Sequence, residues 1–237
     1  MMPTSQPGVP RREEVRTLLA REDDFGVALV LILLTVIIFA AAEGPIGQLA
    51  SVALSGGTLL FVIHTADGHR RTFRVSAVVV GIAILSAAAA TVVGGDTATA
   101  TAGLVGLLLA VIAPLVILRR IVFSPTITVR LVLGALAIYL LLGLAYAYLF
   151  PLISTLSHMP FFVQTARPDA SDYIYFSYTT LATVGFGDFT AASSVGRMAA
   201  VSEALIGQLY LVSAVALLVG NVGRTLRRNE PGGRPEE

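Results

Sequence analysis

Six apolar segments follow one another along the chain, and they give it its main pattern. Each is near the roughly 20 residues that a helix needs to cross the hydrocarbon core of a bilayer. The breaks between them are short and rich in Gly, Pro and Asp, as turns are. The pattern predicts an all-α membrane protein with helices at about residues 25–42, 46–63, 73–93, 102–118, 128–150 and 198–220.

Composition supports a membrane setting and narrows the chemistry. The chain has 237 residues, of which 55% are hydrophobic and 13% are charged, and its mean hydropathy is +0.81. A soluble domain carries about 25% charged residues. There are no cysteines, which excludes disulfides and thiol catalysis. The net charge of +1 predicts no nucleic-acid partner.

The arginines predict the orientation of the segments. With the N-terminus inside, all of the 16 basic residues except Arg167 and Arg197 fall on the cytoplasmic side. Positive residues favour the cytoplasmic loops of membrane proteins. We therefore expect six spans in the cell membrane with both termini in the cytoplasm, and the Arg-only, Ala-rich usage suggests a bacterial source.

A long segment separates the fifth and sixth predicted spans. Residues 154–169 contain Pro160 and Pro168 and are expected to be irregular. Residues 172–182 then predict a helix, capped by Asp172 or Ser171, that is too short to span the bilayer. A helix that enters the membrane and returns is tolerated only where protein or a cavity surrounds it.

This short helix leads directly into the run Thr183-Val184-Gly185-Phe186-Gly187-Asp188. The longer run from Thr179 to Asp188 resembles the selectivity filter of the tetrameric potassium channels, and the resemblance is specific over about residues 131–222. In that family, backbone carbonyls replace the hydration shell of the ion. Closely spaced inward carbonyls require positive φ at some positions, where glycine fits without strain.

The resemblance implies a role for each residue of the run. The carbonyls of Thr183, Val184, Gly185 and Phe186, with the Thr183 hydroxyl, would bind K⁺, and Gly187 would allow the strand to turn. No other cofactor is expected. Because one chain supplies one strand of the filter, the resemblance also implies a homotetramer around a central pore.

The residues expected to support the filter from behind or above are Tyr175, Thr179 and Asp188, together with Glu203 of the sixth segment. Phe186 stands where the family usually has Tyr, and Thr179 stands where the best-known bacterial relative has Glu. Asp188 would accept a hydrogen bond from Tyr175. The alternative for Asp188 is an exposed carboxylate that concentrates cations at the outer mouth.

The sixth segment carries an acidic residue in an apolar setting. An ionisable group inside a membrane is costly and is a candidate functional residue. Glu203 would bond either to the pore helix, at Ser177, Thr179 or Thr180, or to the fifth span, at Tyr146 or Tyr148. Gly207 is expected to be a gating hinge, or else to pack against the pore helix. Helical spacing directs four side chains toward the cavity: Gln208, Val212, Val215 and Val219.

The sequence divides into five parts. Residues 1–24 and 223–237 form cytoplasmic tails, residues 25–118 form a four-helix peripheral domain, residues 119–128 form a linker, and residues 129–222 form the pore domain. The peripheral domain occupies the position of a voltage sensor. Its fourth segment contains no Arg or Lys, so little intrinsic voltage dependence is expected. Arg224, Arg227 and Arg228 would contact anionic lipid head groups; the sequence leaves open whether an accessory subunit takes part.

The predicted function is passive, potassium-selective conduction. A nonselective cation channel on the same pore is the first alternative, and a subunit of an active potassium transporter is the second. No nucleophile with a base, nucleotide loop or metal cluster predicts an enzyme.

Overall fold

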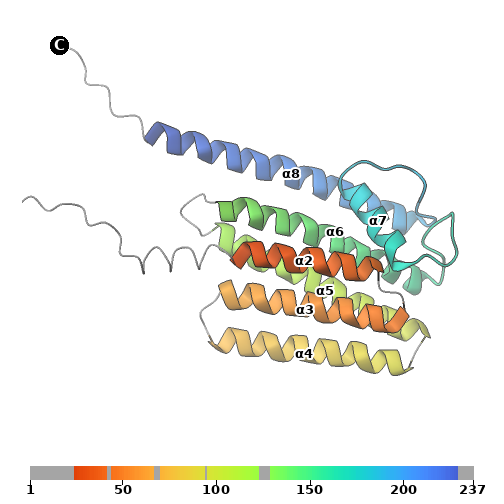
Figure 1. Ribbon diagram of the computed structural model, residues 1–237. Helices are drawn as coiled ribbons and strands as arrows, with labels where there is room; N and C mark the ends of the chain where they lie inside the picture. The colour runs from red at the N-terminus through yellow and green to blue at the C-terminus, as the bar shows by residue number, and fades with distance from the viewer. Residues whose placement is uncertain (1–23, 42–43, 67–69, 94, 123–128, 229–237) are drawn as a thin grey trace, which may run out of the picture.

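The chain folds into long helices that lie side by side in a computed structural model (Figure 1). The structure describes residues 24–41, 44–66, 70–93, 95–122 and 129–228. Within these ranges it contains the helices α2 (Asp24–Ala41), α3 (Gly44–Ala66), α4 (Arg70–Val93), α5 (Gly95–Val122), α6 (Val129–Ser157), α7 (Ala170–Leu181) and α8 (Ser194–Arg228). The order of helices is the one that the hydropathy pattern predicts.

Several predicted boundaries are wrong, in most cases because the helices continue beyond their apolar cores. α6 passes through Pro151 and ends at Ser157, so residues 154–157 are helical rather than irregular. α5 extends to Val122 and takes in the first part of the predicted linker. α8 begins at Ser194 and continues to Arg228, past the predicted end of the pore domain. The predicted N-terminal tail, apart from residue 24, lies outside the described residues.

The helices α2 and α5 pack against the helices of the C-terminal half of the chain. α5 lies along α6, while α2 contacts both α6 and the short helix α7. α3 sits between α2, α4 and α5, and α4 lies at the far edge of the bundle (Figure 1). The contact with α6 is formed by small and apolar side chains, including Ala102, Ala110 and Ala113 of α5 and Ala137, Leu144 and Ala147 of α6.

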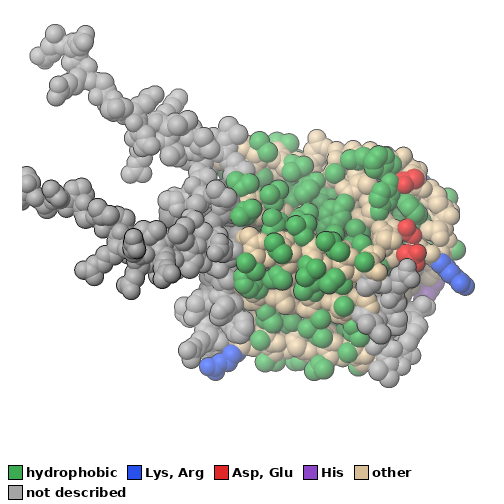
Figure 2. All heavy atoms as spheres, in the orientation of Figure 1, with side chains coloured by type: hydrophobic (Ala, Val, Ile, Leu, Met, Phe, Trp, Pro, Cys, Tyr) green, Lys and Arg blue, Asp and Glu red, His purple; other side chains and the backbone are tan. Residues whose placement is uncertain are grey.

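The surface of the molecule carries a broad apolar band. Figure 2 shows hydrophobic side chains over the middle of the visible face, with the charged side chains at its ends. Three helical segments in the described part of the chain are long and apolar enough to cross a membrane: Ala100–Leu118, Val132–Ser157 and Ser194–Leu217. Shorter apolar segments occur in α2, α3 and α4. An exposed apolar surface of this kind marks a membrane protein.

An aromatic cluster holds the segment between α6 and α8 at the end of the bundle that carries α7. Phe150, Phe161 and Phe162 are almost fully buried there and pack against Tyr173 and Phe176 of α7. The Phe150 and Phe176 rings meet edge to face, with centroids 5.2 Å apart. This segment is therefore anchored to α7 by packing as well as by its backbone.

We predict that an added methyl group at Gly106 destabilises the contact between α5 and α6. A Cβ atom there would lie 2.4 Å from the ring of Tyr148, and overpacking of this kind costs about 1–3 kcal/mol. Gly106→Ala should therefore lower the unfolding temperature, measured by circular dichroism in detergent.

Gly57→Ala is the matched control for that substitution. Gly57 is also helical, but nothing lies within 4 Å of the position of its Cβ. Alanine is up to about 1 kcal/mol better than glycine in a helix, so this variant should unfold at the wild-type temperature or above. Equal unfolding temperatures for the two variants would contradict the close contact.

Candidate ion-conduction site

The segment that follows α7 has an unusual backbone. Thr183, Gly185 and Gly187 all have positive φ, of 58°, 51° and 81°. Positive and negative φ therefore alternate along the run, since neither Val184 nor Phe186 has positive φ. The two glycines adopt this conformation without strain, whereas Thr183 does so against its preference.

Hydrogen bonds fix the direction in which the peptides of this run face. The Val184 and Gly185 N–H groups both donate to the Thr179 carbonyl, at 2.8 and 3.2 Å. Successive N–H groups thus point toward α7. In a trans peptide the carbonyl points away from the N–H, so the carbonyls of Thr183 and Val184 face away from α7. The arrangement presents a row of oxygen atoms on the free side of the strand.

α7 is itself anchored to α6 by hydroxyl groups. Tyr178 donates to the Leu140 carbonyl at 2.7 Å, and Tyr139 of α6 donates to the Leu181 carbonyl at 3.2 Å. Gly143 allows the Tyr178 ring to approach, because a Cβ at this position would lie 2.6 Å from it. The two bonds hold the C-terminal end of α7, from which the strand begins.

The N-terminal end of α7 is capped differently from the prediction. The cap is Asp169, and the Asp172 carboxylate accepts a hydrogen bond from the Asp169 N–H at 2.9 Å. Asp172 therefore lies in the first turn rather than before it. An acidic side chain there interacts favourably with the helix dipole.

The outer end of the strand is covered by aromatic rings. Tyr175 stacks on Phe186, with ring centroids 6.2 Å apart and planes 8° apart. A side-chain hydrogen bond with Asp188, then desolvation and last the Asp188 charge raise the pKa of the Tyr175 hydroxyl above its ordinary value. The structure thus brings together the two residues expected to interact. The Thr179 hydroxyl donates to the Tyr175 carbonyl within α7, so the contact of Thr179 with residues 184 and 185 is made by its carbonyl.

α8 is exposed along most of its described length, but one stripe is buried. The stripe consists of Gly196, Glu203 and Gly207. Glu203 is 0% exposed, and its Oε1 atom lies 2.5 Å from the Ser177 hydroxyl oxygen. Ser177 is one of the three pore-helix partners considered for Glu203. The alternative partners bond elsewhere, Tyr146 to Ser202 and Tyr148 to Ser55.

Gly207 lies directly against the end of α7. A Cβ atom at this position would lie 2.6 Å from the Leu181 carbonyl oxygen. This contact gives Gly207 a packing role, while the hinge stays a prediction. Gln208, Val212 and Val215 are exposed in the single chain, and the Val219 side chain lies outside the described part.

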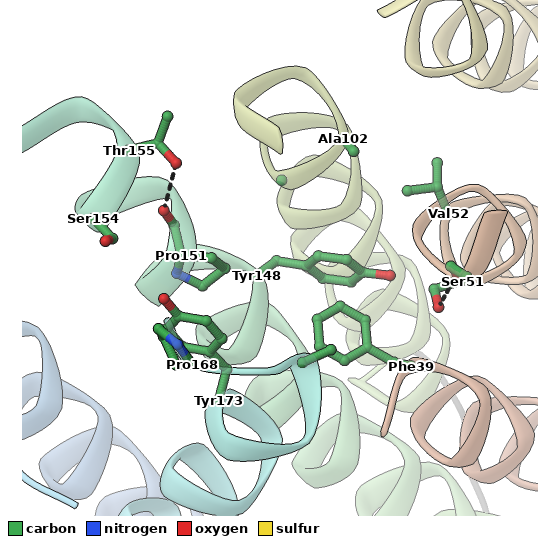
Figure 3. A pocket seen from close by; sticks show the side chains of 13 residues that line it. Phe39, Ser51, Val52, Ala102, Tyr148, Pro151, Ser154, Thr155, Pro168 and Tyr173 are labelled. Atoms are coloured by element: carbon green, nitrogen blue, oxygen red, sulfur yellow. Dashed lines mark hydrogen bonds between the residues drawn. The ribbon is translucent and has the colours of Figure 1, made fainter. Parts of the chain in front are cut away.

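A cavity of about 270 Å³ lies where the peripheral helices meet the pore helices (Figure 3). The Tyr148 ring projects across it toward Ser51 and Val52 and meets the Phe39 ring edge to face. Hydroxyl groups that line the cavity have partners within the chain; the Thr155 hydroxyl, for example, donates to the Pro151 carbonyl at 3.0 Å. We assign the cavity no ligand.

In the residues that the structure describes, no group of three His, Cys, Asp or Glu side chains could hold a metal ion. The oxygen atoms that residues 183–187 offer to a cation are backbone carbonyls and the hydroxyl of Thr183. Sequence reasoning identified the strand and both glycines, but it missed the left-handed backbone of Thr183, for which the sequence carries no signal.

Comparison with known proteins supports the same region as functional. Residues 134–224, from within α6 to within α8, match a family model described as "Ion channel". The match supports an ion channel domain in this part of the chain, and with it passive ion conduction across a membrane. Comparisons with curated proteins and with solved structures gave no match.

We predict that Gly207→Ala destabilises the protein through the contact with Leu181. The contacted atom is the backbone oxygen of Leu181, which cannot rotate away. The free energy of unfolding should therefore fall by about 1–3 kcal/mol. The unfolding temperature should fall, whereas Gly81→Ala, at a helical glycine with nothing within 4 Å, should not lower it. If Gly207 acted only as a hinge, channel opening would change while the unfolding temperature stayed at the wild-type value.

Proposed function

We propose that this protein is a potassium-selective channel in which residues 183–187 form the selectivity filter. The observation that carries the proposal is the alternation of positive φ at Thr183, Gly185 and Gly187. Together with the shared acceptor at Thr179, it turns successive carbonyls to one side. A row of carbonyls can replace the hydration shell of a potassium ion.

The proposal requires four copies around one axis. One strand can offer oxygen atoms to only one side of an ion, so the remaining oxygens must come from other subunits. Two features of the isolated chain support this requirement. Val184 and Phe186 are 53% and 69% exposed, and α8 leaves a line of apolar side chains uncovered: Val201, Leu205, Leu209, Val212 and Val215. In a tetramer these surfaces would meet the neighbouring subunits and the central cavity.

The peripheral helices are proposed to complete six spans with both termini in the cytoplasm. The apolar segments of α2, α3 and α4 and the placement of the arginines support this topology. α7 would then enter the membrane and return, with its C-terminal end directed to the cavity, where its partial negative charge stabilises a cation.

Ion flux from the purified protein in liposomes tests the proposal. We expect flux under a potassium gradient and much less under a sodium gradient. Gly185→Ala should abolish the potassium flux, because alanine at φ +51° costs about 1–2 kcal/mol in each of four strands and adds a methyl group beside the ions. Gly57→Ala makes the same chemical change away from the filter and should conduct normally.

The other outcomes distinguish the alternatives. Equal sodium and potassium flux would contradict selectivity and favour a nonselective cation channel. Potassium movement against its gradient would favour a transporter subunit. Light scattering on the same preparation should give the mass of four chains, and a smaller mass would contradict the tetramer.

We also predict a shallow dependence of current on voltage. Among the described positions, the span Ala100–Leu118 of α5 contains no basic residue. Moving one charge across the membrane yields about 2.3 kcal/mol per 100 mV, and steep gating needs several such charges. Single-channel recording between about −100 and +100 mV, a range that includes ordinary resting potentials, should show a nearly constant open probability. A steep change would contradict this prediction.

A further inference from the structure

Among the described residues, no basic side chain is a partner of Glu203, whose carboxyl group meets the Ser177 hydroxyl. Glu203 is completely buried in α8, inside the candidate span Ser194–Leu217. Arg197, the basic residue of α8 nearest to it in sequence, is exposed and donates to the Ala192 carbonyl. The titratable groups that face Glu203 are Tyr139 from α6 and Tyr178 from α7. Both tyrosine hydroxyls donate to backbone carbonyls.

The two short contacts of the Ser177 hydroxyl determine whether Glu203 carries a proton. The Ser177 hydroxyl oxygen lies 2.7 Å from the Gly143 carbonyl oxygen and 2.5 Å from Oε1 of Glu203. A serine hydroxyl has one proton to donate, and a carbonyl can only accept. If Ser177 donates to Gly143, the proton in the shorter contact must belong to Glu203.

The opposite assignment leaves the site poorly satisfied. If an ionised Glu203 accepted the Ser177 proton, the Ser177 and Gly143 oxygens would face each other at 2.7 Å without a proton between them. The carboxylate would have one donor for two oxygens, because Oε2 has no hydrogen-bond partner among the residues that the structure describes. A buried carboxylate is normally stabilised by two or three donors or by a counter-charge. A neutral acid needs only an acceptor for its proton, and Ser177 is one.

We propose that Glu203 is a neutral carboxylic acid that donates to Ser177, which in turn donates to Gly143. This relay joins α8, α7 and α6 directly behind the strand of residues 183–187. Glu203 is then a positioning residue that fixes α7 through Ser177, without contact with the ions. Its importance for conduction rests on the proposed function, but its protonation state does not.

Infrared difference spectroscopy of the full-length protein tests this proposal without ion flux. The sample is held at neutral pH in a detergent free of ester groups, because lipid esters absorb where a protonated acid does. The spectrum of the wild type minus that of Glu203→Gln should contain the carbonyl band of a protonated acid, and the band should shift in heavy water. If this difference spectrum contains the bands of an ionised carboxylate instead of the acid band, the proposal is overturned.

Two further samples keep the test decisive. Ser177→Ala removes the acceptor, so the acid band should remain but change in frequency; an unchanged band would show that Glu203 does not donate to Ser177. If Glu203→Gln does not fold, wild-type protein labelled with ¹³C at its glutamate carboxyl groups should show one isotope-shifted acid band at neutral pH. Its absence would contradict the neutral acid.

Discussion

The site depends on one acceptor, the carbonyl of Thr179, which binds two successive N–H groups of the strand after α7. A chain with uniform φ and ψ in the β region turns successive carbonyls to opposite sides. Two neighbouring N–H groups that share an acceptor require the backbone to alternate in handedness, and the positive φ values at residues 183, 185 and 187 provide this. The direction of the carbonyls is therefore set by the end of α7.

The position of α7 must consequently be more precise than hydrophobic packing alone would give. Hydroxyl groups bond to backbone carbonyls at both sides of the α6–α7 contact, from Tyr139, Ser177 and Tyr178. Such bonds have a defined direction, whereas apolar contacts do not. Gly143 and Gly207 permit the close approach on which they depend. The buried Glu203 adds a bond from the third helix, so α7 is held on two faces.

The sequence predicted the helices and the strand because their signals are local. Apolar length marks a span, and Gly-x-Gly after a short helix marks the strand. The left-handed backbone of Thr183 could not be predicted, because threonine disfavours it and only the bond to α7 enforces it. The choice of Ser177 as the partner of Glu203, among three neighbouring hydroxyls, depends on the rotation of α7 about its axis, which is a tertiary property.

The peripheral helices differ from the pore helices in how they are held. α5 packs on α6 through small apolar side chains, and its described span carries no charge that a membrane potential could move. Such a contact can pass on a displacement of α5, but it contains no charge on which the membrane potential could act. α2 reaches α7 as well as α6, so a shift of the peripheral group, whatever drives it, would act first on the helix whose end fixes the strand. Any coupling between the two parts would therefore reach residues 183–187 through α7.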